Sequence, residues 1–252
     1  MEPKTITIDP LSAVSLHVET WFDNVCLSFA TGFIIERDGS FYLVTNWHVF
    51  SGRHPKTLKP LSKTSAIPNK IRVWYHVKDR VGNWVAKTHD LLDKDGKELW
   101  VSRDFKGEKI DIAVLGIQKT DDIIFYPLDT KLESTDIVIS PSEPVSIIGF
   151  PGGQTSDGKF PIWKTGHVAS DIGLDYSGKP IFLIDATTKP GMSGSPVLAK
   201  RVGMITTSEG IKMGGQATKF MGVYSGRVSD DEAPDSSNLG QVWKPHVIDS
   251  FF

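Results

Sequence analysis

Apolar residues along the chain recur mainly with the two-residue period of β-strands. Residues 71–77, 83–87 and 99–102 alternate well enough to be strands that each bury one face. Residues 93–97, which lie between the last two runs, are polar, contain a glycine and predict a hairpin turn. In addition, 23 glycines and 15 prolines separate short runs rich in Val, Ile, Phe and Trp. The pattern predicts an all-β fold.

The length of 252 residues suits one β-rich unit of two packed barrels and does not by itself require another domain. We expect residues 13–125 to form the first barrel and residues 126–228 the second. Residues 229–252 are expected to form a linker and a C-terminal segment. In that segment, the apolar pattern of residues 239–252 predicts a short helix on the outside of the molecule. Pro245 limits the length of this helix.

The most informative segment is the loop at residues 185–197, which contains Gly191-Met192-Ser193-Gly194. A serine hydroxyl is a weak nucleophile at neutral pH, so it needs a base and also needs donors for the oxyanion that follows attack. Ser193 is the candidate nucleophile. The amides of Gly191 and Ser193 are the candidate oxyanion donors, because glycine lets the backbone turn tightly around one oxygen. Such strings also occur in ordinary turns, so the motif alone is modest evidence.

A candidate base and a candidate orienting acid lie upstream of this loop. Residues 41–49 form a β-rich run that contains His48, and Asp111 opens the apolar run 112–115. His48 would take the Ser193 proton, and Asp111 would fix the imidazole tautomer. Taken singly, the histidine could be a packing residue and the aspartate a turn residue. Three residues in the order His, Asp, Ser, each in a suitable local context, favour catalysis.

These segments resemble the trypsin-like (chymotrypsin-fold) serine peptidases, particularly the bacterial branch of high-temperature-requirement proteases. The similar segments follow the family's order between about residues 25 and 230: 31–35, 45–49, 111–115, 148–153, 182–196 and 222–227. The resemblance implies two packed, six-stranded Greek-key β-barrels, the first carrying His48 and Asp111 and the second carrying Ser193. It also implies a site where the barrels meet, with chemistry that needs no metal or organic cofactor.

The resemblance further indicates substrate-binding positions. Thr187 and Thr188 would lie on the pocket wall that leads to the nucleophile, and Tyr224, Ser225 and Gly226 on a strand that pairs with an extended peptide. Thr187 stands where trypsins carry the acidic residue of the pocket base, so a preference for Lys or Arg is not expected. We expect the substrate residue whose carbonyl is attacked (P1) to have a modestly polar or a small-to-medium apolar side chain.

Two further positions bear on specificity and activation. His167 resembles pocket histidines that recognise Glu or Gln in some relatives, although its alternation on a predicted strand favours a structural role. Met192 replaces the aspartate that precedes the nucleophile in animal trypsins. Activation through a freshly cut N-terminus is therefore not expected.

The net charge, the lack of a long apolar run and the single cysteine bear on the binding partners and the cellular location of the protein. A net charge of −2 gives no reason to expect nucleic acid, and no apolar run approaches the ~18 residues that cross a bilayer. Cys26 is the only cysteine, and it lies in an apolar run, so we expect it to be a small buried core residue. Because no second cysteine is present to form an intrachain disulfide, we expect a cytoplasmic protein. A basic stretch interrupted by prolines predicts a solvated loop, with a site for a phosphate or an acidic partner as the alternative. It comprises Arg53, Lys56, Lys59, Lys63, Lys70 and Arg72.

The leading hypothesis is a serine endopeptidase that acts on a protein or peptide substrate through an acyl-enzyme, with no metal. The alternative is a latent or inactive protease-fold module that binds extended peptides or is gated by a regulatory protein partner. Neither nucleic acid nor a membrane is an expected partner. An esterase of the α/β-hydrolase class is excluded, because its nucleophile motif needs glycine where Ser195 stands and its triad order is different.

Overall fold

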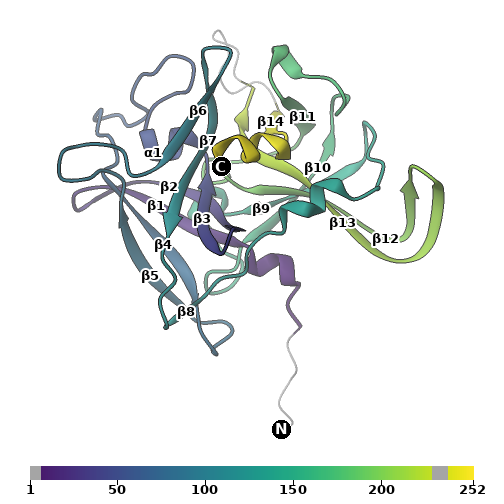
Figure 1. Cartoon of the computed structure of the whole chain (residues 1–252), viewed down its shortest axis with the longest axis horizontal. Helices are drawn as coiled ribbons and strands as arrows, with labels where there is room; N and C mark the ends of the chain where they lie inside the picture. Colours follow the sequence, from purple (N-terminus) through teal and green to yellow (C-terminus); the bar gives the residue numbers. More distant parts are fainter. Residues whose placement is uncertain (1–6, 229–237) are drawn as a thin grey trace.

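The computed structural model describes residues 7–228 and 238–252, which are built mainly of antiparallel β-strands (Figure 1). The first half of the chain forms one sheet with the strand order β5-β4-β1-β2-β3-β7-β6, and β8 pairs with β4. The strands of this sheet are β1 (Ser15–Phe22), β2 (Val25–Arg37), β3 (Ser40–Thr45), β4 (Lys70–Val77), β5 (Trp84–Asp90), β6 (Val101–Phe105), β7 (Glu108–Ile117) and β8 (Ile123–Ile124).

The second half of the chain forms a closed barrel in the order β10-β11-β14-β13-β12-β9. Its strands are β9 (Pro144–Gly149), β10 (Ile162–Val168), β11 (Ile181–Asp185), β12 (Pro196–Thr207), β13 (Gly210–Arg227) and β14 (Leu239–Trp243). The helices of the described chain are short: α1 (Trp47–Ser51) and the 3₁₀ segments η1 (Pro10–Ala13), η2 (Thr130–Ser134), η3 (Pro151–Gly153), η4 (Tyr176–Gly178) and η5 (Pro245–Phe251).

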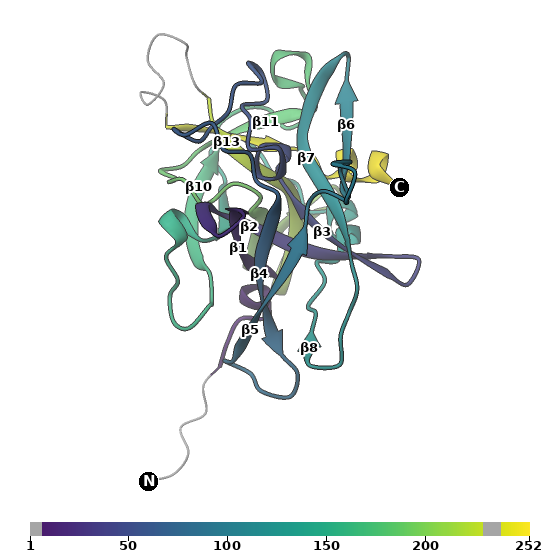
Figure 2. The ribbon, with the colours of Figure 1, turned by 90° about the vertical axis from the view of Figure 1, so that its left-hand side faces the viewer.

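The expected all-β class is confirmed, but the first unit differs from a closed six-stranded barrel. It has eight strands, and within the described range its end strands β5 and β6 do not pair with each other. The separation of 63 positions between His48 and Asp111 accounts for the difference, because β4, β5 and β6 lie within this interval. Figure 2 shows β4 and β5 facing the viewer on this outer side of the sheet.

Strand β2 joins the cores of the two units. Successive side chains of a strand point to opposite faces. Ala30 and Ile34 therefore enter the core of the first sheet, whereas Phe33 and Ile35 enter a second core between the units. In that second core they meet residues of the barrel such as Phe220, whose ring lies 5.9 Å from that of Phe33. Burial on both faces explains why Phe33, Ile34 and Ile35 follow one another without an intervening polar residue.

The C-terminal segment forms a strand and then a helix. Leu239–Trp243 (β14) closes the barrel between β11 and β13, in place of the first turns of the helix expected over residues 239–252. The helix follows as η5, with Pro245 at its start, where a missing amide proton costs nothing. Val247, Ile248 and Phe251 of η5 are buried in the core between the units.

The expectation that Cys26 is a core residue is wrong. The hairpin that joins β1 to β2 turns at Asp23, and its end, including Cys26, is exposed. The apolar run around the cysteine belongs to the projecting end of a hairpin rather than to its buried middle.

The barrel closure depends on one glycine, which suggests a test. Gly222 has φ +134, and a Cβ atom there would lie 1.9 Å from the carbonyl oxygen of Trp243 in β14. We expect Gly222→Ala to lower the free energy of unfolding by about 2–4 kcal/mol, measured by urea denaturation. The control is Gly116→Ala in β7, an exposed position with open space around it, which should change stability by less than about 0.5 kcal/mol. Equal effects of the two substitutions would show that β14 does not require glycine here.

Candidate active site

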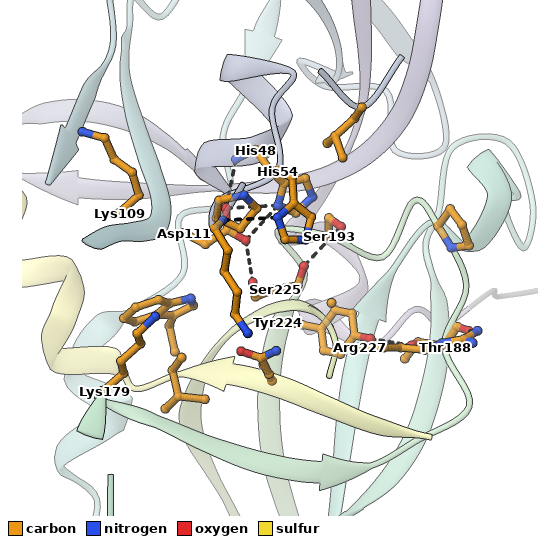
Figure 3. Close-up of a pocket in the computed structure, with 18 of the residues that line it drawn as sticks. His48, His54, Lys109, Asp111, Lys179, Thr188, Ser193, Tyr224, Ser225 and Arg227 are labelled. Atoms are coloured by element: carbon orange, nitrogen blue, oxygen red, sulfur yellow. Dashed lines mark hydrogen bonds and ion pairs between the residues drawn. The ribbon is translucent and has the colours of Figure 1, made fainter. Parts of the chain in front are cut away.

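Three elements bring the candidate residues to one pocket (Figure 3). His48 lies in the short helix α1, Asp111 lies in β7, and Ser193 lies in the loop between β11 and β12. Asn46, with extended backbone, caps the start of α1, and Gly52 in the left-handed conformation ends it. The single helical turn after β3 directs the His48 ring towards Asp111.

His48 and Asp111 form a close pair. Nδ1 of His48 lies 3.0 and 2.8 Å from the two carboxylate oxygens, and the His48 amide also donates to Oδ1 at 2.9 Å. An ionised carboxylate only accepts hydrogen bonds, so the proton of a neutral imidazole sits on Nδ1. Nε2 is then the basic nitrogen of the ring.

The Asp111 carboxylate is buried and needs these donors. Burial alone raises the pKa of a carboxyl group, but the charge of His48 and the hydrogen bonds from His48 and Ser225 outweigh burial and lower the pKa of Asp111. The Ser225 hydroxyl donates to Oδ2 at 2.5 Å. Asn46 holds the backbone in place through a 2.7 Å bond from its side-chain amide to the Asp111 carbonyl. Asp111 therefore stays ionised and oriented at neutral pH.

The loop before Ser193 turns at Gly191. Its φ is +98, and a Cβ atom there would lie 2.2 Å from the carbonyl oxygen of Phe150, so only glycine fits. Among the described residues, none accepts a hydrogen bond from the amides of Gly191 or Ser193, whereas the neighbouring Gly194 amide is bonded to Tyr224. Two amides without protein acceptors, on either side of Met192, are the donors that an oxyanion site requires.

Thr31 holds this loop in place. Its hydroxyl donates to the Gly191 carbonyl at 2.8 Å and accepts from the Phe150 amide at 3.1 Å. Its amide donates to the Ser193 carbonyl at 2.8 Å, and its carbonyl accepts from the Thr45 hydroxyl at 2.7 Å. The residue is fully buried. Every polar group of Thr31 thus anchors either the loop of Ser193 or the strand that leads to His48.

The Ser193 hydroxyl donates to the Ser225 carbonyl at 3.4 Å. Within the described chain no hydrogen bond joins it to His48. In enzymes without bound substrate, the hydrogen bond between a nucleophile and its base is commonly long or misaligned and tightens when substrate binds.

The structure brings most, but not all, of the expected substrate-binding residues to the pocket. Thr188, Tyr224, Ser225 and Gly226 line it, and the hydroxyls of Thr188 and Tyr224 are 2.5 Å apart. Burial raises the pKa of Tyr224, so its hydroxyl is protonated at neutral pH. The expectation for Thr187 is wrong: it does not line the pocket and is exposed, whereas its neighbours Ala186 and Thr188 are buried.

His167 also lies away from the pocket. It is exposed on β10, opposite Asp185 of β11.

Sequence reasoning missed the role of two hydroxyls. From the sequence, Thr31 belongs only to a segment that resembles the family, and Ser225 only to a strand expected to pair with a peptide. A hydroxyl inside an apolar strand needs a partner when it is buried, and this was the available signal for Thr31. No comparable signal exists for Ser225, whose contact with Asp111 joins residues 114 positions apart.

Over the described residues, no three His, Cys, Asp or Glu side chains gather as metal ligands would. The same part of the chain has no helix long and apolar enough to cross a membrane.

Comparison with known proteins identifies the family of this site. The family described as a trypsin-like peptidase domain matches residues 30–205. A search among proteins of curated function finds no match. The crystal structure of the Rv3671c protease, inactive form, is 16% identical with a TM-score of 0.49, and the match covers 95% of this chain and 87% of that one. A serine endoprotease from Yersinia pestis is 15% identical with a TM-score of 0.48, and the match covers 98% and 66% of the two chains.

The anchoring role of Thr31 can be tested by removing its hydroxyl. Thr31→Val leaves the Gly191 carbonyl and the Phe150 amide without a partner, and each such buried group costs about 1–3 kcal/mol. We expect urea denaturation to show a loss of about 2–4 kcal/mol. Thr31→Ser keeps the hydroxyl and should lose about 1 kcal/mol for the missing methyl group. Equal losses for the two variants would contradict the role, and Thr165→Val, at an exposed position, is the control.

A second test concerns His17, which supports the turn beside this loop. His17 is buried, its Nε2 donates to the Gly153 carbonyl at 3.2 Å, and its ring packs edge-on against Phe150. Burial, followed by the charge of Lys159, lowers the pKa of His17 from 6.5 to about 4, against smaller opposing effects of Gly153 and Glu19. Between these pH values the unfolded chain binds a proton that the folded protein does not. The contribution of neutral His17 to the free energy of unfolding is therefore fully present above pH 6.5 and is lost as the pH falls towards 4.

We expect this proton to cost about 3 kcal/mol of unfolding free energy between neutral pH and pH 4, because one pKa unit corresponds to about 1.4 kcal/mol. His17→Gln keeps an amide donor near the Nε2 position but does not titrate. Urea denaturation across this pH range should give a flatter profile for that variant. The control is His246→Gln, at an exposed position, which should retain the wild-type slope. Parallel profiles for wild type and His17→Gln would rule out His17 as the source.

Proposed function

Because the chain belongs to the trypsin-like peptidase domain family, we propose that it is a serine endopeptidase that hydrolyses peptide bonds through an acyl-enzyme. The observation that carries the proposal is the pairing of His48 with the buried Asp111 in the pocket that Ser193 lines. A buried carboxylate bonded to Nδ1 leaves Nε2 basic, which is what a serine nucleophile needs from its histidine.

In the proposed reaction the Ser193 oxygen attacks the peptide carbonyl carbon while His48 Nε2 takes its proton. The tetrahedral intermediate collapses, the C–N bond breaks, and His48 gives the proton to the leaving amine. Water then attacks the acyl-serine with His48 again as the base, which releases the acid product and restores the Ser193 hydroxyl. Asp111 keeps its negative charge throughout and stabilises the imidazolium form.

The amides of Gly191 and Ser193 are the proposed donors to the oxyanion. Their lack of acceptors within the described chain supports this role, as does the anchoring of the Gly191 carbonyl by Thr31. Preorganised donors act without reorganisation when charge develops on the oxygen, and one such donor is worth about 10²–10³-fold in turnover. Tyr224, Ser225 and Gly226 are proposed to contact the peptide on the same side of the pocket.

One observation favours a second candidate, a peptidase gated by a partner. The Ser193 hydroxyl is bonded to the Ser225 carbonyl and not to His48 within the described chain. A partner or a bound peptide that displaces this contact would free the hydroxyl for His48. In this case the isolated protein is a latent module that binds extended peptides.

Within the family, we propose that the chain belongs to the bacterial branch of high-temperature-requirement proteases, because residues 45–49 and 111–115 resemble the histidine and aspartate segments of that branch. The lone cysteine, exposed on a hairpin, supports action in a reducing compartment such as the cytoplasm. Protein or peptide substrates are the proposed partners, rather than nucleic acid or a membrane.

The proposal is tested with a fluorophosphonate probe and intact-mass detection of the adduct. Wild type should gain one adduct, mapped to Ser193, and His48→Ala should label far more slowly because the hydroxyl loses its base. Against a casein or peptide substrate, Ser193→Ala should lower turnover by about 10⁶-fold. The matched control is Ser208→Ala in the exposed turn between β12 and β13, which should behave as wild type.

Activity that survives Ser193→Ala would refute the assignment. A folded wild-type protein that does not react with the probe until a peptide or partner is added would favour the gated alternative over a constitutive enzyme.

A further inference from the structure

A second, smaller pocket also reaches His48 and Ser193. Its volume is about 190 Å³, against about 390 Å³ for the pocket that contains Tyr224. The larger pocket extends along β13, whereas the smaller one extends towards the hairpin of β1 and β2 and the loop that follows α1. The two pockets therefore meet at the candidate nucleophile and its base.

The proposed reaction assigns a different part of the substrate to each pocket. The carbonyl oxygen of the attacked bond points to the oxyanion donors, and the leaving nitrogen faces His48 Nε2, from which it takes a proton. The acyl side of the peptide is proposed to lie against Tyr224, Ser225 and Gly226. Of the two pockets that meet at Ser193, the smaller one is then available to the leaving side of the peptide. This step rests on the proposed function.

The walls of the smaller pocket are mainly apolar. Leu27 and Phe29 come from β2, and Leu61, Ala66 and Pro68 come from the loop that follows α1. Phe29 is 43% exposed and Leu61 is 52% exposed. Apolar surface is thus available for a ligand to remove from water, which is favourable.

Two of these side chains are supported from behind. The Phe29 ring lies 5.5 Å from the ring of His17, and a Cβ atom at Gly153 would lie 2.7 Å from the Phe29 ring. The Leu61 amide donates to the carbonyl of Gly52 at 2.8 Å, which ties the loop to the end of α1. A pocket that is already ordered loses little entropy when a side chain enters it.

The smaller pocket also lacks partners for a charged side chain. Among the described residues that line it, none is Lys, Arg, Asp or Glu. The hydroxyls of Thr20 and Ser28 bond to each other at 2.9 Å, and the Ser62 hydroxyl bonds to that of Thr64 at 2.9 Å. A charge placed here would lose hydration without compensation. In contrast, four lysines line the wall of the larger pocket: Lys56, Lys109, Lys179 and Lys189.

We propose that the smaller pocket selects an apolar side chain, such as Leu or Phe, on the substrate residue that follows the cleaved bond. Leu27, Phe29 and Leu61 are the specificity-determining residues. The volume of about 190 Å³ suits one side chain, since it is below the ~300–1,000 Å³ of typical small-molecule sites. The apolar run at residues 25–29, which does not enter the core at Cys26, instead supplies Leu27 and Phe29 to the site.

The test uses internally quenched peptides that differ only at the residue after the intended cleavage bond: Leu, Ala, Asp or Lys. Mass spectrometry locates the cleaved bond. We expect kcat/KM to be about 10- to 100-fold higher for Leu than for Ala, because each methylene group that enters an apolar pocket contributes severalfold. The Asp and Lys peptides should be cleaved more slowly than the Leu peptide by a similar or larger factor.

Substitutions at Leu27 link this preference to the pocket. Leu27→Ala should lower the Leu-to-Ala ratio by about 3- to 10-fold, and Leu27→Asp should favour Lys over Asp at the same substrate position. The control is Leu99→Ala, which removes a leucine that is 49% exposed and lies outside this pocket. It should keep the wild-type ratio.

A wild-type Leu-to-Ala ratio near or below one would overturn the inference, as would a ratio that Leu27→Ala leaves unchanged or that Leu99→Ala lowers equally. Fluorophosphonate labelling of Ser193 separates these results from failure of the proposed function. If no peptide is cleaved, calorimetry on Ser193→Ala with the Leu and Ala peptides decides. Tighter binding of the Leu peptide that Leu27→Ala abolishes supports the inference, and equal binding overturns it.

Discussion

The buried hydroxyl of Thr31 is the interaction on which the geometry of the candidate site depends. β2 is held from both faces, since its alternate side chains enter two different cores. In the middle of that strand, one hydroxyl donates to the Gly191 carbonyl and accepts from the Phe150 amide. The loop of Ser193 therefore cannot shift without breaking bonds in a dry environment, where an unpaired polar group is costly. Thr31 thus connects the rigid core to the loop that contains the candidate nucleophile.

Asp111 provides the corresponding constraint on the histidine. A carboxylate removed from water is unfavourable unless donors replace its hydration. Its donors come from both halves of the chain: the amide and ring of His48 from the first unit and the hydroxyl of Ser225 from the barrel. Packing of the two units and orientation of the imidazole are thus coupled. A change that separates the units would expose the carboxylate and release the histidine together.

The motifs that predicted the site are local, and this is why they could be identified from the sequence. A histidine at the end of a β-run, an aspartate opening another, and a glycine-flanked serine each need only a few neighbouring residues to be recognised. The strand period likewise predicted the all-β class. What failed depends on register and closure between distant segments: the eight strands of the first sheet, the strand β14, the exposure of Cys26 and the outward direction of Thr187. Local sequence carries no information on which partner a strand will find.

The pocket holds charges in two different surroundings. Asp111 is nearly out of contact with solvent, and its charge is stabilised by hydrogen bonds from His48 and Ser225. The lysines of the wall stand in or near water, where salt screens a charge over about 10 Å. The buried carboxylate acts on the histidine through direct hydrogen bonds, whereas the basic side chains of the wall face the cleft. The orientation of the histidine therefore depends on a charge that is shielded from solvent, whereas the lysines of the wall are exposed to screening by salt.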